Sequence, residues 1–375
     1  MLSLLPAGVE RKLLNRDEVS VQDTVAKSSV QVRSLTRQFY EPDSLLNAKT
    51  DSVYNKMTVQ ERAAQMIMSA SSPKLGLSYT RVKNSLKNNQ AANVLFLKGS
   101  LAAFIVQKEE LDQVHADSNR LPALYACDCE PSLLHKKWAD VKAVKAASQT
   151  GSPEEAGAVA EKINEVMKPL RIGLNFAPVV DVGGNKAIIG NRSYGTNKKN
   201  IVNFSSSFVQ ATQYGNVAAT IKHFPGHGAV RGDTHKQAVF IDGPLTELDN
   251  FKNVIDSSSP VAILVGHITV KNNKAYGTAG LPSTLSSVII KKLLREELGF
   301  SGLVVTDAMN MGAVSRIAGA DYKAAVAGND IIVMPLNAKA LHAKIVKALQ
   351  KHDELSVQFE QSIKRVIRLK LIQLK

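Results

Sequence analysis

The chain has 375 residues, of which 44% are hydrophobic and 21% are charged. This composition excludes a disordered, collagen-like or coiled-coil chain, and the length permits either two medium domains or one large α/β barrel. The formal net charge of +14, from 47 basic and 33 acidic residues, favours anionic partners. Because the basic residues are scattered, aromatic residues make up only 5%, and no nucleic-acid-binding motif occurs, we expect no nucleic-acid partner.

The N-terminal part of the chain differs from the rest. Residues 1–50 mix Ser, Asp, Arg and Gln with weak periodicity, so we interpret them as an irregular or loosely helical N-terminal extension. The apolar start, Met1–Pro6, is too short for the core of a signal peptide, which favours a cytoplasmic over a periplasmic location. No linker or repeat divides residues 51–375, and no apolar stretch approaches the roughly 18 residues that a membrane span needs. We therefore expect residues 51–375 to form one domain without a membrane span.

From residue 51 onward, short apolar runs alternate with longer segments of helical periodicity. Eight runs are candidate strands: Gln65–Ala70, Ala92–Leu97, Pro122–Cys127, Gly173–Pro178, Val217–Lys222, Val261–Gly266, Gly302–Thr306 and Asp330–Met334. The candidate helices include residues 102–118, 152–170, 201–214, 245–257, 285–298 and 338–349. Runs that are apolar on both faces and alternate with helices predict a buried parallel sheet. Eight such units favour an α/β fold of the (β/α)8 TIM-type barrel class over an open sheet.

Local signals make predictions about helix ends and cysteines. Ser152, followed by Pro153 and Glu155, predicts a helix N-cap with a carboxylate that can complete a capping box. Gly299 stands where a left-handed C-terminal stop is expected. The only two cysteines, Cys127 and Cys129, exclude a disulfide framework; on a strand we expect them to point to opposite faces and not to bridge.

Polar and charged residues follow five of the candidate strands. They are Asp128 after the third run, Asp181 shortly after the fourth, Lys222 and His223 at the end of the fifth, His267 after the sixth, and Asp307 after the seventh. The carboxyl ends of barrel strands, with the loops that follow them, form the catalytic face of such barrels. We therefore expect these side chains to meet in one active site.

The segment 222–235, KHFPGHGAVRGDTH, contains three of the eight histidines. Its glycines and proline predict a shaped loop rather than a helix. Asp233 and His235 are two residues apart, so in an extended stretch they project to the same side, and the carboxylate can orient the imidazole and raise its basicity. The alternative is a loop histidine satisfied by a neighbouring carbonyl group, but the density of titratable groups at a strand end favours the acid/base pair.

Two further segments carry candidate functional side chains. Asp307 directly follows an apolar run, where a carboxylate is costly to bury unless it is paired or used. It can serve as a nucleophile, as a metal ligand or, most simply, as the N-cap of a following helix. Arg192 lies between Gly190 and Gly195, in a loop that can direct the guanidinium inward as a forked donor or leave it on the surface.

Several motifs stand in one order along residues 52–370. They are NFAPVVDV, GNRSYG, KHFPGHG followed by DTH, VGHI, LPSTLS, ELGFSGLVVTDAMNMGAV and AGNDIIVMP. Together they resemble glycoside hydrolase family 3, in particular its single-domain β-N-acetylglucosaminidases. The combination of KHFPGHG with DTH is the specific signal, whereas each other motif is weak alone. The resemblance implies a (β/α)8 barrel, in agreement with the eight candidate strands.

The resemblance also implies roles for individual residues. Asp307 matches the catalytic nucleophile, and His235, held by Asp233, matches an acid/base dyad on a mobile loop. Four further residues match positions that bind the N-acetylglucosamine unit: Asp128, Arg192, Lys222 and His223. The implied reaction is retaining and needs no cofactor: the carboxylate forms a glycosyl-enzyme, and the imidazole acts first as acid and then as base. This differs from most retaining glycosidases, which use two carboxyl groups.

The loop after the third strand departs from the family pattern, which is Asp-x-Glu-Gly-Gly-Arg-Val-x-Arg. Here the stretch is Asp-Cys-Glu-Pro-Ser-Leu-Leu-His-Lys, residues 128–136. Both glycines are absent, Leu133 replaces one arginine, and Lys136 replaces the other, which keeps the charge but loses the planar fork. We therefore expect Lys136 to contact the substrate from an altered loop.

These observations predict a monomeric, exo-acting retaining β-N-acetylglucosaminidase that acts on N-acetylglucosamine-containing glycans, with peptidoglycan fragments as the natural substrate. Some relatives with this dyad transfer the sugar to phosphate, so both hydrolase and phosphorylase stay open. One alternative hypothesis is a metal-dependent barrel hydrolase, with candidate ligands His223, His227, His235, His267 and Asp307. Another, motivated by the altered loop, is a non-catalytic glycan-binding barrel.

Overall fold

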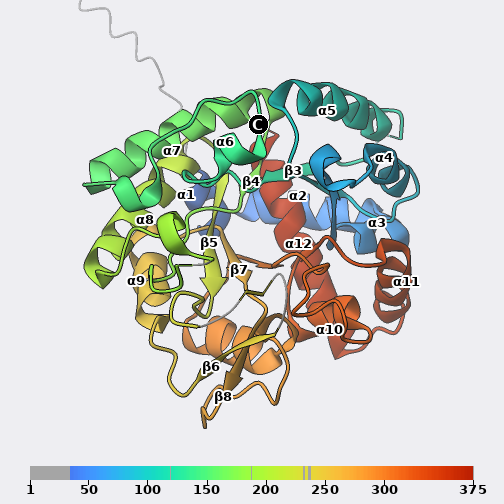
Figure 1. Cartoon of the computed structure of the whole chain (residues 1–375). Helices are drawn as coiled ribbons and strands as arrows, with labels where there is room; N and C mark the ends of the chain where they lie inside the picture. Colours follow the sequence, from blue (N-terminus) through green and yellow to red (C-terminus); the bar gives the residue numbers. More distant parts are fainter. Residues whose placement is uncertain (1–33, 119, 187, 231–232, 235–237, 375) are drawn as a thin grey trace, which may run out of the picture. The chain divides into compact units, whose positions relative to one another are not determined.

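The structure, a computed structural model, describes residues 34–374 except 119, 187, 231–232 and 235–237. Its centre is a sheet of eight parallel strands surrounded by helices (Figure 1). The strands are β1 (Ile67–Ser71), β2 (Asn93–Phe96), β3 (Leu124–Cys127), β4 (Leu174–Asn175), β5 (Ala218–Phe224), β7 (Ala262–Val265), β9 (Leu303–Thr306) and β10 (Ile332–Val333). The order β10-β1-β2-β3-β4-β5-β7-β9 is closed by a parallel bridge between Val305 and Ile331. The predicted (β/α)8 barrel is confirmed, and every predicted run contributes a strand.

The barrel strands are buried on both faces, as their apolar sequences predict. Every residue of β2, β3, β7 and β9 is buried. Strand β5 is also buried throughout, although it ends in the polar pair Lys222 and His223. Since burying such groups is costly without partners, this end of β5 marks a site where the barrel interior becomes polar.

Helices cover the outside of the barrel. They are α1 (Leu35–Tyr40), α2 (Ser44–Lys56), α3 (Val59–Ala64), α4 (Tyr79–Lys87), α5 (Leu101–Ala116), α6 (Leu134–Lys137), α7 (Pro153–Met167), α8 (Lys198–Tyr214), α9 (Leu248–Ser258), α10 (Ala320–Ala327), α11 (Ala338–Leu349) and α12 (Glu354–Gln373). Of these, α5, α7, α8, α9 and α11 match predicted segments within a few residues at their ends. The segment Val288–Glu297 forms a further helix with π-type hydrogen bonds. None of the described helices combines the length and apolarity that a membrane crossing requires.

The predicted helix-end signals are confirmed except for one. The Ser152 side chain accepts a hydrogen bond from the Glu155 N–H, and Pro153 is the first residue of α7. Gly299 adopts a left-handed φ of 64° just after the helix 288–297. The capping box, however, does not form, because the Glu155 carboxylate accepts from the Gly151 N–H instead and pairs with Lys145.

Residues 34–50, which the sequence assigned to an irregular or loosely helical extension, are largely helical. Most of them belong to α1 and α2, where Leu35, Phe39 and Leu46 are buried. The Asp43 side chain caps α2 by accepting from the Leu46 N–H at 2.9 Å. Arg368 of α12 donates to the backbone carbonyl of Phe39 at 2.8 Å, which ties α1 to the C-terminal helix. Residues 1–33 lie outside the described part of the chain.

The expectation that Cys127 and Cys129 do not bridge is wrong. They form a disulfide with a Cα–Cα separation of 5.5 Å at the carboxyl end of β3. Side chains alternate between the two faces of an extended strand, so residues two apart share a face rather than opposing each other. The bridge lies directly beside Asp128, the first candidate sugar-binding residue.

A small second sheet lies outside the barrel. Strands β6 (Val239–Asp242) and β8 (Ile268–Lys271) pair in parallel within the loops that follow β5 and β7 (Figure 1). The sequence did not predict them, because both runs are short and lie inside loops. They extend the carboxyl-end rim of the barrel next to the loop that contains Asp233.

Candidate active site

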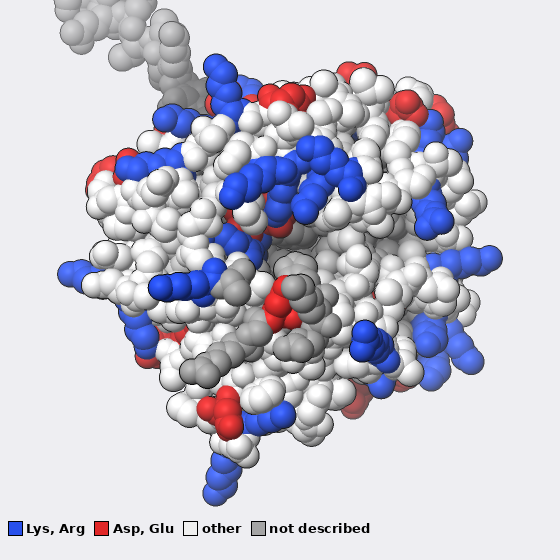
Figure 2. All heavy atoms as spheres, in the orientation of Figure 1, with Lys and Arg blue, Asp and Glu red and all other residues white. Residues whose placement is uncertain are grey.

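A cavity of about 500 Å³ opens at the carboxyl ends of the barrel strands. Figure 2 shows a hollow near the centre of this face, with Lys and Arg side chains gathered along one side of it. Of the predicted site residues, five line this cavity: Asp128, Arg192, Lys222, His223 and Asp307. The apolar part of its lining includes Leu95, Phe176, Leu264 and Val333. The expected convergence of strand-end side chains is therefore present among the described residues.

Asp307 follows β9 and faces the cavity. Its backbone N–H donates to the Val265 carbonyl at 3.0 Å, and its Oδ1 accepts from the Ala308 N–H at 2.8 Å. Burial opposes ionisation, but the neighbouring His267 and His223 rings and the Ala308 N–H outweigh it and lower the pKa of the carboxyl. The next α-helix begins only at Ala320, so Asp307 is not a helix N-cap. This leaves an ionised carboxylate directed at the cavity.

A network of alternating charges forms the opposite wall. The Lys222 ammonium lies 2.5 Å from an oxygen of Asp128 and 2.5 Å from one of Glu130. Arg192, in the turn Gly190–Arg192, donates to both oxygens of Glu130 at 2.7 Å each, a bidentate pair. Burial disfavours the Glu130 anion, yet Arg192 and Lys222 hold its pKa well below the usual range. Since the guanidinium points inward, the surface alternative for Arg192 does not apply.

His223 is oriented by Asp181, which follows β4. The His223 Nδ1 lies 2.6 Å from an Asp181 oxygen, and its Nε2 lies 3.3 Å from a nitrogen of Arg192. Because an ionised carboxylate only accepts, Nδ1 donates its proton to Asp181. Asp181 also accepts from the His227 N–H at 2.8 Å, so one buried carboxylate positions both the His223 ring and the start of the next loop.

Glu247, at the start of α9, ties down the loop that continues from β5. Its carboxylate accepts from the backbone N–H groups of Val182, Gly228 and Ala229 at 2.7, 3.3 and 2.8 Å. A Cβ on Gly228 would lie 1.9 Å from the Val182 carbonyl oxygen, so only glycine permits this approach. Burial and the nearby Asp181 raise the pKa of Glu247 to about 7, against the effect of the three N–H donors.

The predicted acid/base dyad lies only partly within the described residues. His235 lies outside them, whereas Asp233 is half-buried and Thr234, between the two, lines the same cavity as Asp307. The Thr234 hydroxyl lies 3.2 Å from Nε2 of His227, and its carbonyl accepts from the Ala313 N–H at 3.1 Å. Thr234, the neighbour of Asp233, thus lies at the edge of the cavity.

Comparison of the sequence with the family pattern predicted that Lys136 contacts the substrate, but Lys136 does not lie at the cavity. It is exposed and does not line the cavity, whereas Lys137 is buried, lines it, and donates to a carboxylate oxygen of Asp128. Both residues lie in the single turn of α6, where successive side chains are rotated by about 100°. With two glycines of the family loop replaced, the turn directs the second lysine, not the first, toward the wall that contains Asp128.

Sequence reasoning missed several residues that shape the site. Glu130 was visible as the acidic residue retained from the family pattern, and Asp181 was noted only as a strand-end carboxylate. Lys137 and Glu247 have no signal in the linear sequence, because their roles depend on a short helix and on a contact between distant loops. Among the described residues, no group of three or more His, Cys, Asp or Glu side chains is arranged to hold a metal ion.

The model of the "Glycosyl hydrolase family 3 N terminal domain" matches residues 58–369. The chain belongs to glycosyl hydrolase family 3. It is 28% identical over 299 residues to "Beta-hexosaminidase A" of Pseudoalteromonas piscicida, a match that covers 73% of this chain and 48% of that protein. It is 34% identical over 168 residues to a "Beta-hexosaminidase" of Vibrio cholerae, which covers 44% and 49% of the two chains. The chain thus spans about half the length of these curated family 3 relatives.

Solved family 3 structures share the fold. A family 3 β-N-acetylglucosaminidase from Paenibacillus sp. aligns with a TM-score of 0.76 at 27% identity, covering 85% of this chain and 63% of that one. A β-N-acetylhexosaminidase from Beutenbergia cavernae aligns with a TM-score of 0.68 at 23% identity, covering 84% and 99%. The second similarity supports the barrel alone, whereas the first also bears on the chemistry proposed below.

Proposed function

We propose that this chain is a retaining, exo-acting β-N-acetylglucosaminidase that removes terminal N-acetylglucosamine from glycans. The names of its relatives, β-hexosaminidase and β-N-acetylglucosaminidase, support this substrate class. The observation that carries the proposal is the position of Asp307, a carboxylate of lowered pKa, in the same cavity as Asp128, Arg192 and Lys222. A nucleophile and a set of sugar-sized polar contacts therefore share one pocket.

In the first step, an oxygen of Asp307 attacks the anomeric carbon while the bond to the leaving oxygen breaks. The protonated ring of His235 gives its proton to that oxygen, and Asp233 stabilises the imidazolium beforehand. The Ala308 N–H, which already holds Oδ1 at 2.8 Å, orients the carboxylate for attack. The products of this step are the departing alcohol and a covalent glycosyl-enzyme.

In the second step, the neutral imidazole of His235 takes a proton from water as the water oxygen attacks the anomeric carbon. The bond to Asp307 breaks, the sugar leaves with its original configuration, and both side chains regain their starting charges. Asp128, Lys222 and Arg192 would bind the sugar hydroxyl groups through both steps. Their buried, mutually paired arrangement holds the donors and acceptors in place before substrate arrives.

Peptidoglycan fragments are the natural substrate in this proposal. Such fragments carry carboxylate groups beyond the terminal sugar, and the chain carries a formal net charge of +14. The Lys and Arg side chains along one side of the hollow would face the anionic part of a bound fragment (Figure 2).

The test compares wild type with Asp307→Ala on a chromogenic N-acetylglucosaminide, with Asp256→Ala, an exposed carboxylate on α9, as the control. Wild type and Asp256→Ala should release the chromophore, and Asp307→Ala should be slower by at least about 1,000-fold, as is typical for loss of a nucleophile. No turnover by any of the three, together with sugar binding by all, would instead favour a non-catalytic glycan-binding barrel.

The acceptor in the second step is tested in the same assay. We expect free N-acetylglucosamine as the product whether or not inorganic phosphate is present. Accumulation of the sugar 1-phosphate in phosphate buffer would identify the chain as a phosphorylase, with the nucleophile and the dyad unchanged.

A further inference from the structure

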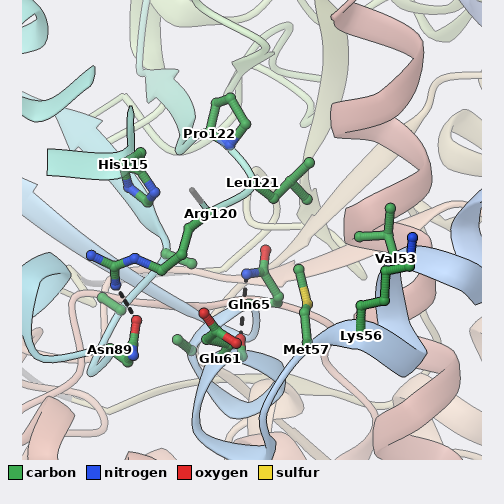
Figure 3. Close-up of a pocket in the computed structure, with 13 residues that line it drawn as sticks. Val53, Lys56, Met57, Glu61, Gln65, Asn89, His115, Arg120, Leu121 and Pro122 are labelled. Carbon is green, nitrogen blue, oxygen red and sulfur yellow. Dashed lines mark hydrogen bonds between the residues drawn. The ribbon is translucent and has the colours of Figure 1, made fainter. Parts of the chain in front are cut away.

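A second cavity, of about 380 Å³, lies at the amino ends of β1, β2 and β3. Its lining includes Gln65, Ala92 and Pro122, each just before one of these strands. Because the barrel strands are parallel, their amino ends form the face opposite the active site. Figure 3 shows His115 and Arg120 on one side of this pocket and Val53, Lys56 and Met57 on the other. The pocket thus has one side with His115 and Arg120, and another where the apolar Val53 and Met57 lie beside Lys56.

Basic side chains near this pocket are bound to neutral acceptors. Arg120 donates to the Leu86 carbonyl at 2.8 Å and to the Asn89 side chain, and the buried Lys370 ammonium donates to Gln65 and to the Ala92 carbonyl at 2.7 and 3.0 Å. Within the described residues, neither side chain forms an ion pair, and burial lowers the pKa of Lys370 to about 7, so Lys370 is only partly charged at neutral pH. Buried positive charge of this kind is normally neutralised by a carboxylate or a bound anion.

The nearby carboxylates are already engaged elsewhere. Glu61 accepts from the N–H and hydroxyl of Thr58 at the start of α3, at 2.8 and 2.9 Å. Asp112 accepts from the Tyr125 hydroxyl at 2.7 Å and pairs with Lys108. Glu61 also lines the pocket and acts on Arg120 through its charge, but the two side chains form no ion pair, so the protein itself compensates the positive charge around the pocket only in part.

His115 is the clearest sign of a missing ligand. It lines the pocket and is 4% exposed, and its ring nitrogens, apart from an approach to the backbone of Leu121, have no hydrogen-bond partner of good geometry among the described residues; Nε of Arg120 also lacks one. Buried polar groups in native proteins are almost always hydrogen-bonded, so we expect a bound ligand to form hydrogen bonds with these atoms. Burial, Lys370 and Arg120 lower the pKa of His115 to about 4, so the ring is neutral when the pocket is empty.

We propose that this pocket binds a small organic carboxylate, with the carboxylate group at the His115–Arg120 side and an apolar body against Met57 and Leu121. The anion would accept hydrogen bonds from donors that otherwise have none and would offset the charge of Arg120 and Lys370. An anion beside His115 favours the protonated ring, so binding near pH 6 takes up a proton. This site is separate from the proposed sugar-binding cavity, and its test does not depend on glycosidase activity.

The test is calorimetric titration of the full chain with phenylacetate, with its neutral analogue phenylacetamide and with inorganic phosphate, in buffers of different ionisation enthalpy. We expect phenylacetate to bind with uptake of a proton, and the other two compounds to bind at least tenfold more weakly. Equal binding of the amide, tighter binding of phosphate, or binding without proton uptake would overturn the proposal, as would no binding of phenylacetate at millimolar concentration.

Two variants test where phenylacetate binds. His115→Gln should weaken phenylacetate binding at least tenfold and abolish the proton uptake, whereas the exposed His352→Asn should change neither. Met57→Trp, which fills the pocket from its apolar side, should block binding while leaving the far side of the barrel intact. This second variant keeps the test decisive if His115→Gln fails to fold. Unchanged affinity in Met57→Trp would place the ligand elsewhere and refute the site.

Discussion

Glu247 is a single side chain that fixes the geometry of the loop after β5. Its buried carboxylate accepts three backbone N–H groups and so joins the segment after β4 to the segment after β5. Burial and Asp181 raise its pKa from 4.5 to about 7. In the folded chain Glu247 therefore keeps its proton over a pH range in which the unfolded chain has lost it.

This difference predicts how stability depends on pH. The contribution of Glu247 is fully present below about pH 4.5, falls as the pH rises toward 7, and is lost above it, because only the folded state still binds the proton in that window. Glu247→Gln removes the titrating group, so the free energy of unfolding of wild type minus that of the variant should fall by about 3 kcal/mol from pH 4.5 to 7.5. Urea unfolding at several pH values measures it.

The control for this prediction is Asp249→Asn, an exposed carboxylate on the same helix. Its difference from wild type should stay constant over the same pH range. A constant difference for Glu247→Gln as well would mean that Glu247 has an ordinary pKa in the folded chain.

His235 can be tested through the leaving group, since an acid catalyst matters most when the departing oxygen is basic. His235→Ala should slow hydrolysis of an unactivated disaccharide by about 100-fold or more, whereas an activated aryl glycoside should be much less affected in the glycosylation step. The measurement is kcat/KM for both substrates. Equal losses on both would mean that His235 has a structural rather than a catalytic role.

Among the helices, the short α6 determines which lysine reaches the cavity wall that contains Asp128. Lys137 is buried beside Asp128, whereas Lys136 is exposed. Lys137→Ala should raise KM for the chromogenic substrate about tenfold or more, because Asp128 loses a charged partner. The matched variant Lys136→Ala should leave KM within twofold. The reverse result would restore the assignment made from the linear family pattern.

The strands and helices also show which parts of the fold could be predicted from the sequence and why the other parts could not. The eight barrel strands were predictable because each is a short, doubly buried apolar run between helical segments, a pattern with few alternatives. Asp128 and Asp307 were predictable because they directly follow such runs, and Lys222 because it ends one. The helical start of the described chain was not, since residues 34–50 have weak periodicity and gain their order by packing on α12.

Other errors came from contacts that no local pattern specifies. The position of Lys137 depends on the direction in which a single helical turn points after two glycines are replaced. Glu247 acts through backbone groups of loops that lie 65 and 18 residues away in sequence. The cysteine bridge was missed for a simpler reason, because residues two apart on a strand were assigned to opposite faces.

At the scale of the whole molecule, the net charge of +14 should act on substrates at a distance. We expect kcat/KM for an anionic peptide-bearing muropeptide to fall several-fold between 10 and 200 mM salt, since the Debye length shrinks from about 30 Å to below 10 Å. A neutral chitin disaccharide should show no such dependence. Equal salt effects on both substrates would show that the charge plays no part in selecting the substrate.

The proposed mechanism requires that Asp307 forms a covalent bond to the sugar. This bond is tested most directly by mass spectrometry of the chain after incubation with 5-fluoro-N-acetylglucosaminyl fluoride, first intact and then digested. We expect one added sugar per chain, on the peptide that contains Asp307, and no adduct in Asp307→Ala. An adduct on another residue, or turnover of the reagent without any adduct that can be trapped, would contradict it.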